Sequence, residues 1–124
     1  MSHPSKSKAV RVHETELRVG SLLLDLARHQ AFSHGQPISL TRLEFALLRH
    51  LLTNAHRVVT VDELVGCVIE GIHRPGSSLV RVHICHLRRK LGYAGAAIRT
   101  IRGVGLCLDE SWLEANRYNG PKDK

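Results

Sequence analysis

The chain has 124 residues, 43% of them hydrophobic and 23% charged, and this composition is typical of one globular domain. It contains no run of about 18 apolar residues, and its start "MSHPSKSKAV" lacks the apolar stretch of a secretory signal. Its three cysteines show no CxxC spacing. From these features we expect a reduced, cytoplasmic protein that is not stapled by disulfides and does not span a membrane.

The net charge of +7 is concentrated in one segment. Residues 71–108 contain seven Arg or Lys and no Asp or Glu, whereas the other 11 basic residues match the 11 acids. Such segregation is typical of a surface that binds a polyanion. A solvated basic surface without a partner is the alternative interpretation.

The first part of the chain predicts an arm and a sheet. Residues 1–12 are polar and basic, and we expect a disordered arm there. Residues 13–40 alternate short apolar runs, "ELRVGSLLLDL", "RHQAFS" and "QPISL", with turn signals such as Gly20 and His34-Gly35. This pattern predicts a small antiparallel sheet of short strands.

Two helices begin at similar signals. Thr41-Arg42-Leu43-Glu44 is a capping box, and the sequence "RLEFALLRHLLTN" after Thr41 repeats apolar residues every three or four positions. Thr60-Val61-Asp62-Glu63 predicts a second start. We expect this second helix to be short, because its interior Gly66 costs about 1 kcal/mol relative to Ala. The following "GIHRPGSS" has the composition of a loop.

A third helix and a hairpin complete the predicted elements. The helix is expected over residues 77–91, with Ser77 or Ser78 as its N-cap. The sequence "IRTIRGVGLCL" then predicts two short strands with Gly103-Val104-Gly105 at the tip. We expect residues 109–124 to form a poorly ordered C-terminal tail, with local docking of Trp112 and Leu113.

The run His83-Ile84-Cys85-His86 raises the question of a metal or catalytic site. At about 100° per residue, the His83 and Cys85 side chains project about 160° apart, so only His83 and His86 converge. A zinc site needs three or four ligands, so we expect no metal and no cofactor. A nucleophilic Cys85 would need a base within reach, but His86 diverges by about 100°. The sequence therefore argues against an enzyme.

The same helix suits the major groove of DNA. Its core stripe is predicted to be Val80, Ile84, Leu87 and Leu91, which leaves hydroxyl, apolar, thiol, imidazole and guanidinium groups on the opposite face. The hairpin adds basic side chains beside a narrow glycine-bearing tip, which fits a minor groove. The predicted fold is therefore α+β: a winged helix-turn-helix with an N-terminal antiparallel β-sheet, three helices and a C-terminal β-hairpin wing.

Four motifs in this order, "ISLTRLEFALLRHLL", "RVVTVDELV", "VRVHICHLRRKL" and "IRTIRGVGLCL", resemble the effector domain of OmpR/PhoB-type response regulators. The resemblance covers residues 13–108. It implies a four-stranded N-terminal sheet, a third helix in the major groove, a wing in the minor groove, and two copies bound head to tail on direct repeats. Arg81, where the family usually has Asp, and Cys85-His86 depart from the family pattern. These departures concern the recognised sequence rather than the fold.

The predicted site combines the helix geometry with this resemblance. The expected DNA contacts of the third helix are Ser78, Leu79, Val82, His83, Cys85, His86, Arg88 and Arg89. Those of the wing are Arg99, Thr100, Arg102 and Gly103. By the resemblance, Ile72, His73 and Arg74 would belong to a loop that touches RNA polymerase.

The predicted function is sequence-specific binding of double-stranded DNA in transcription regulation. The chain would be the output domain of a two-component response regulator or a stand-alone regulator without a receiver domain. One alternative is a winged-helix protein-interaction module that has lost DNA binding. A redox or metal sensor that uses Cys85 and the histidines is another.

Overall fold

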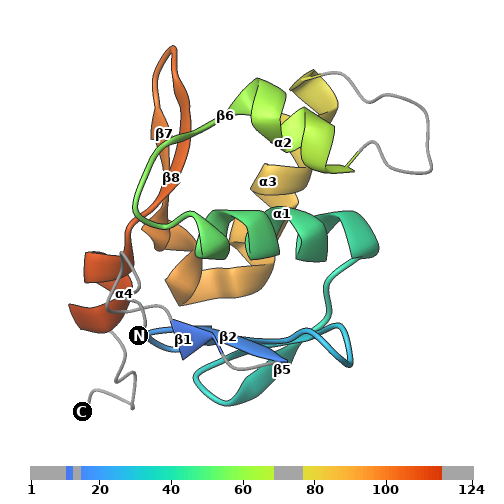
Figure 1. The fold of residues 1–124 in the computed structure, drawn as a ribbon, viewed down its shortest axis with the longest axis vertical. Coiled ribbons are helices and arrows are strands. Elements are labelled where there is room, and N and C mark those ends of the chain that lie inside the picture. The colour runs from blue at the N-terminus through green and yellow to red at the C-terminus, as the bar shows by residue number, and fades with distance from the viewer. Residues whose placement is uncertain (1–10, 13–14, 69–76, 116–124) are drawn as a thin grey trace, which may run out of the picture.

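The computed structural model describes residues 11–12, 15–68 and 77–115 of the chain. Figure 1 shows three parts: an N-terminal sheet, a layer of helices packed on it, and a hairpin that projects from the opposite side of the helices. The α+β architecture with a C-terminal hairpin confirms the predicted fold class. Within the described ranges, no helix is long and apolar enough to cross a membrane.

The N-terminal sheet is antiparallel, with its strands in chain order. The strands are β1 (Arg11–Val12), β2 (Glu16–Val19), β3 (Leu22–Asp25), β4 (Gln30–Ser33) and β5 (Gln36–Ile38). Alternating residues such as Leu17, Val19 and Leu22 are buried, so one face covers the helices. The sheet has five strands rather than the implied four, because Val12 of the short β1 pairs with Leu17.

The three expected helices are present: α1 (Arg42–Thr53), α2 (Val61–Val68) and α3 (Ser77–Leu91). Thr41 and Glu44 form the predicted capping box at the start of α1. Thr60 Oγ1 accepts from the Glu63 backbone N–H at 3.1 Å and caps α2, whose described part has eight residues.

The predicted core stripe of α3 is confirmed. Val80, Ile84, Leu87 and Leu91 are all buried in one cluster that also contains the leucines of α1. This packing fixes the rotation of α3 about its own axis. The face of α3 opposite the stripe therefore lies at the surface.

The hairpin belongs to a second antiparallel sheet, in the order β6-β8-β7. Its strands are β6 (Val59–Thr60), β7 (Ile98–Ile101) and β8 (Gly105–Leu108). Gly105 was expected at the tip but is the first residue of β8. It is packed so tightly on β6 that an added Cβ would overlap the Val59 carbonyl oxygen. Gly103, with φ of +79°, occupies the turn instead.

The fold continues beyond residue 108, where the sequence suggested a poorly ordered tail. A 3₁₀ helix, η1 (Gly92–Ala97), links α3 to β7, and α4 (Glu110–Ala115) follows the hairpin. Leu113 of α4 is 1% exposed and packs against Gly20, where an added Cβ would lie 2.6 Å from the Leu113 carbonyl oxygen. The Gly20 backbone N–H also donates to Glu114 Oε2 at 3.2 Å. Residues 110–115 are therefore part of the folded unit.

Candidate nucleic-acid interface

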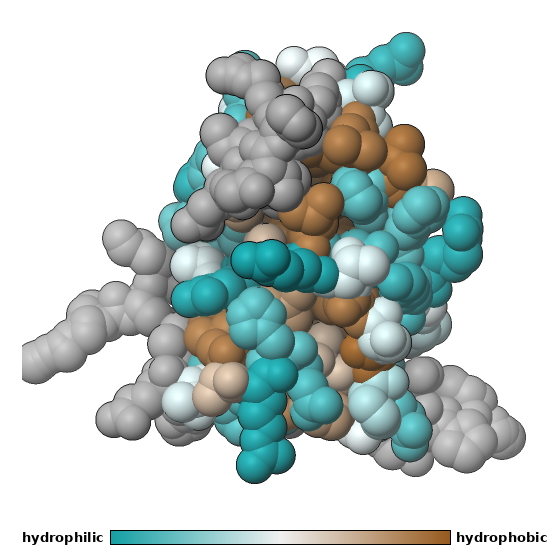
Figure 2. Space-filling model, turned by 90° about the vertical axis from the view of Figure 1, so that its right-hand side faces the viewer, coloured by the Kyte–Doolittle hydropathy of each residue, from teal (hydrophilic) through white to brown (hydrophobic). Residues whose placement is uncertain are grey.

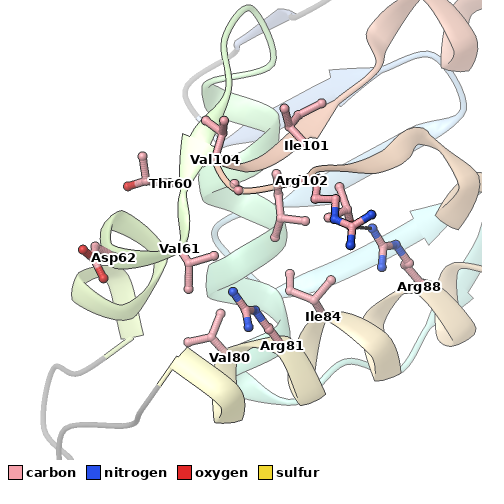
Figure 3. Close-up of a pocket in the computed structure, with 14 residues that line it drawn as sticks. Thr60, Val61, Asp62, Val80, Arg81, Ile84, Arg88, Ile101, Arg102 and Val104 are labelled. Carbon is pink, nitrogen blue, oxygen red and sulfur yellow. Dashed lines mark hydrogen bonds between the residues drawn. The ribbon is translucent and has the colours of Figure 1, made fainter.

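A cleft of about 630 Å³ separates α3 from the hairpin and is closed at one end by the start of α2. Figure 3 shows Arg81 and Arg88 on the α3 side of this cleft, and Arg102 on the hairpin side. Asp62, at the start of α2, also contributes to its wall. Three arginines against one acid give this concave surface a positive charge.

Arg88 fixes the hairpin to α3. Its Nε and Nη2 donate to the Ile98 carbonyl oxygen at 3.0 and 2.8 Å, and Nη2 also donates to Thr100 Oγ1 at 2.9 Å. The side chain is half-buried. Arg88 and Thr100 were both predicted to contact DNA. The structure joins them to each other by a hydrogen bond from a charged donor, and this bond links the helix to the wing.

The exposed face of α3 carries most of the other predicted contacts. Ser78, Cys85 and Arg89 are exposed, and so are the large apolar side chains of Leu79 (41%) and Val82 (46%). The Arg89 Nη2 atom lies 3.9 Å from the Cys85 sulfur. Hydrophobic side chains reach the surface among hydrophilic ones, as Figure 2 shows for one side of the molecule. Such a mixed face can contact both the edges of bases and the phosphates.

The hairpin tip adds apolar side chains that the sequence analysis did not include in the site. Val104 is 52% exposed, and Ile101 is also exposed. They flank Arg102 and Gly103, which are exposed as well. The signal was present in the sequence, because a valine between two glycines at the end of a hairpin has few core residues to pack against.

Ion pairs reduce the number of free cations in the basic segment. Lys90 Nζ lies 2.7 Å from Glu44 Oε1, and Arg99 Nε lies 2.8 Å from Asp109 Oδ2. Among the residues of this segment that the structure describes, the arginines without an acidic partner are Arg81, Arg88, Arg89 and Arg102. Arg88 is engaged by the Ile98 carbonyl and Thr100, so Arg81, Arg89 and Arg102 are the free cations of the candidate interface.

Glu63 holds the start of α2 in place. Arg57 donates to its carboxylate at 2.6 and 3.0 Å, and His50 Nε2 lies 2.6 Å from its Oε2. These hydrogen bonds, that of Arg57 above all, lower the pKa of Glu63 from 4.5 to about 2. The carboxylate therefore stays charged at neutral pH and joins the end of α1 to α2.

Glu44 is an acid buried beside α3, with 2% of its surface exposed. Burial alone would raise its pKa. The Lys90 ammonium and the Thr41 backbone N–H donate to the carboxylate, outweigh that effect and lower the pKa. A charged Glu44 is therefore stable at this position.

Of the His83-Ile84-Cys85-His86 run, His83 and His86 come together as predicted, and a third ligating side chain joins them from another helix. His83 is half-buried. One ligand atom each from Glu44, His83 and His86 lies within 4.8 Å of the other two. The sequence analysis missed Glu44 because it comes from a different helix, about 40 residues earlier in the chain. The predicted polymerase-loop residues Ile72, His73 and Arg74 lie outside the described residues.

Comparison with known proteins gives consistent matches. Residues 35–108 match the family described as "Transcriptional regulatory protein, C terminal". Response regulator protein PmrA of Pseudomonas aeruginosa is 41% identical over 91 residues, which are 73% of this chain and 40% of that protein. Transcriptional regulatory protein VxrB of Vibrio cholerae is 40% identical over 92 residues, which are 74% of this chain and 37% of that protein. The chain thus spans about two fifths of the length of these relatives.

Solved structures with the same fold include two DNA-binding domains. The RstA DNA-binding domain of Klebsiella pneumoniae, crystallised in complex with the RstA box, is 27% identical with a TM-score of 0.67. The match covers 79% of this chain and 99% of that one. The DNA-binding domain of CpxR from E. coli is 33% identical with a TM-score of 0.65, over 75% of this chain and 94% of that one.

Proposed function

Because the chain belongs to the family of C-terminal domains of transcriptional regulatory proteins, we propose that it binds double-stranded DNA sequence-specifically and thereby regulates transcription. The observation that carries this proposal is the exposed face of α3 beside a hairpin, with free arginines on both elements and no acid in residues 77–108. These arginines have no acidic partner within the described structure, and DNA phosphates would pair with them.

In this proposal α3 enters the major groove. The exposed Leu79 and Val82 side chains can contact thymine methyl groups, which mark A·T pairs in that groove. His86 and Cys85 offer polar atoms to base edges. Arg89 is long enough to reach a guanine edge or a phosphate. These side chains would carry the sequence preference.

The hairpin would lie at the neighbouring minor groove. Arginine is favoured in a narrow minor groove, where the negative potential is enhanced. The exposed Arg102 and Val104 project from a turn that Gly103 keeps slim. The Arg88 bonds hold this hairpin at a fixed distance from α3, so that both elements can engage DNA together.

The proposed dimer on DNA and the proposed contact with RNA polymerase are taken from the family resemblance. We propose that two copies bind direct repeats head to tail, and that residues 72–74 belong to a surface that contacts RNA polymerase in the cytoplasm. The similarity to response regulators supports a role as the output part of a two-component system. This chain covers only about two fifths of each relative, so the role in a larger assembly is part of the proposal.

The experiment is selection of bound sites from random duplex DNA, followed by affinity measurements on the selected site and a scrambled one. His86→Ala should change the preferred base and cost about 1–3 kcal/mol at one position if it makes a good base contact. Arg102→Ala should weaken both duplexes together. The matched control is Arg28→Ala, which removes one exposed charge from the N-terminal sheet region. No enriched sequence, or an equal loss in Arg28→Ala and Arg102→Ala, would contradict the proposal.

A further inference from the structure

A cluster of three metal-ligating side chains lies where the first turn of α1 meets α3. Glu44, His83 and His86 each place one ligand atom within 4.8 Å of the other two. The Thr41 N–H and Lys90 Nζ both donate to Oε1 of Glu44. Within the described chain, Oε2 of this carboxylate accepts no hydrogen bond, so it remains available to a ligand.

The His83 ring supplies a second observation. Its Nδ1 atom is buried and has no hydrogen-bond partner in the described part of the chain. Buried polar atoms in folded proteins nearly always have a partner, so this ring is poorly satisfied where it lies. A bound cation between the rings would give the ring a strong interaction that nearby protein groups do not provide.

From this arrangement we infer that Glu44, His83 and His86 bind one divalent transition-metal ion of the zinc type. Two imidazole nitrogens and one carboxylate oxygen form a ligand set that holds Zn²⁺ while leaving a fourth position open. Imidazole ligands favour zinc, copper and nickel, whereas Mg²⁺ and Ca²⁺ prefer sites made of oxygen atoms. The inferred ion is therefore a divalent transition metal of intermediate softness, such as zinc.

The distances fit such an ion after a small adjustment. With metal–ligand bonds of about 2.0–2.1 Å, tetrahedral geometry places ligand atoms about 3.3 Å apart. Starting from separations of at most 4.8 Å, the atoms need to approach by about 1.5 Å or less. His83 and His86 are three positions apart on one face of α3, so small rotations of their rings close this gap.

If the chain binds DNA as proposed, metal binding would change its affinity for DNA. This consequence rests on the proposed function. His86 and His83 belong to the helix assigned to the major groove, and a coordinated ring nitrogen is no longer free to bond a base. The metal would also tie α3 to α1 through Glu44. We therefore expect zinc to weaken binding to the selected DNA site.

The test titrates Zn²⁺ into the chelator-treated full chain by calorimetry, beside His83→Ala, His86→Ala and Glu44→Gln. The control is His56→Ala, which removes an exposed histidine outside the cluster. Loss of an outer-shell partner alone typically changes metal affinity by about 10- to 100-fold, so loss of a ligand should weaken binding by at least about tenfold. We expect one ion per chain, with this loss in both histidine variants and no change in His56→Ala. Since Glu44 also caps α1, the histidine variants carry the test if Glu44→Gln fails to fold.

Two further readouts separate this inference from the proposed function. Zinc should raise the melting temperature of the unmodified chain but not of His83→Ala. If zinc binds as expected while no duplex is bound with or without it, the metal site stands and the proposed function fails. Absence of stoichiometric zinc binding, or equal affinity in His83→Ala, His86→Ala and His56→Ala, would overturn the metal site.

Discussion

Replacing Arg88 with methionine tests whether this residue joins the hairpin to α3 or reads DNA directly. The substitution keeps the aliphatic part of the side chain and removes the hydrogen bonds to the Ile98 carbonyl and Thr100 Oγ1. A hydrogen bond from a charged group contributes about 1.5–3 kcal/mol. Since these bonds share one half-exposed guanidinium, we expect a total loss of about 2–3 kcal/mol in the free energy of unfolding.

Urea denaturation measures this loss directly, and for a domain of this size it corresponds to a melting temperature lower by roughly 10–20 °C. Arg89→Met is the matched control, because Arg89 is the next residue on the same helix and is exposed. Its stability should change by about 0.5 kcal/mol or less. An Arg88→Met protein of unchanged stability that loses affinity only for its selected site would refute the assignment of Arg88 as a clamp.

Three other substitutions follow from the described contacts. Leu87→Ala removes a fully buried side chain of α3 and should cost about 2–5 kcal/mol in chemical denaturation. Gly105→Ala forces a Cβ onto the Val59 carbonyl and should cost about 3 kcal/mol, whereas Gly103→Ala, with open space around it, should cost about 1 kcal/mol of backbone strain. Because the pKa of Glu63 is lowered from 4.5 to about 2, its contribution to stability is present above pH 4.5 and is lost as the pH falls toward 2. The difference in melting temperature between the unmodified chain and Glu63→Gln should therefore shrink over that range, and a difference that grows on acidification would contradict the Arg57 and His50 assignment.

Local signals in the sequence were enough to predict most of the elements. The Thr41 capping box, the apolar stripe of α3 and the position of the hairpin depend on residues only a few positions apart, and the structure confirms all three. Such signals act through the nearest turns of the backbone, so they are readable without knowing the tertiary fold.

The remaining features depend on contacts between distant residues. The bond from Gly20 to Glu114 spans 94 positions and places α4 on the N-terminal sheet. Glu44 is a cap residue by its sequence position, but burial against α3 also brings it beside Lys90 and the His83 ring. Arg88 illustrates the same limit, since no local pattern distinguishes an arginine that holds a hairpin from one that holds a phosphate.

The most direct test of DNA binding through α3 and the hairpin is the salt dependence of affinity for the selected duplex. Arg81, Arg89 and Arg102 are the free cations of this surface in the described chain. If each neutralises one phosphate, log K should fall against log salt concentration with a slope of about −3 per bound chain. Replacing Arg102 with alanine should reduce that slope by about 1, and Arg28→Ala should leave it unchanged. An affinity that does not depend on salt, or a slope unaffected by Arg102→Ala, would contradict the account.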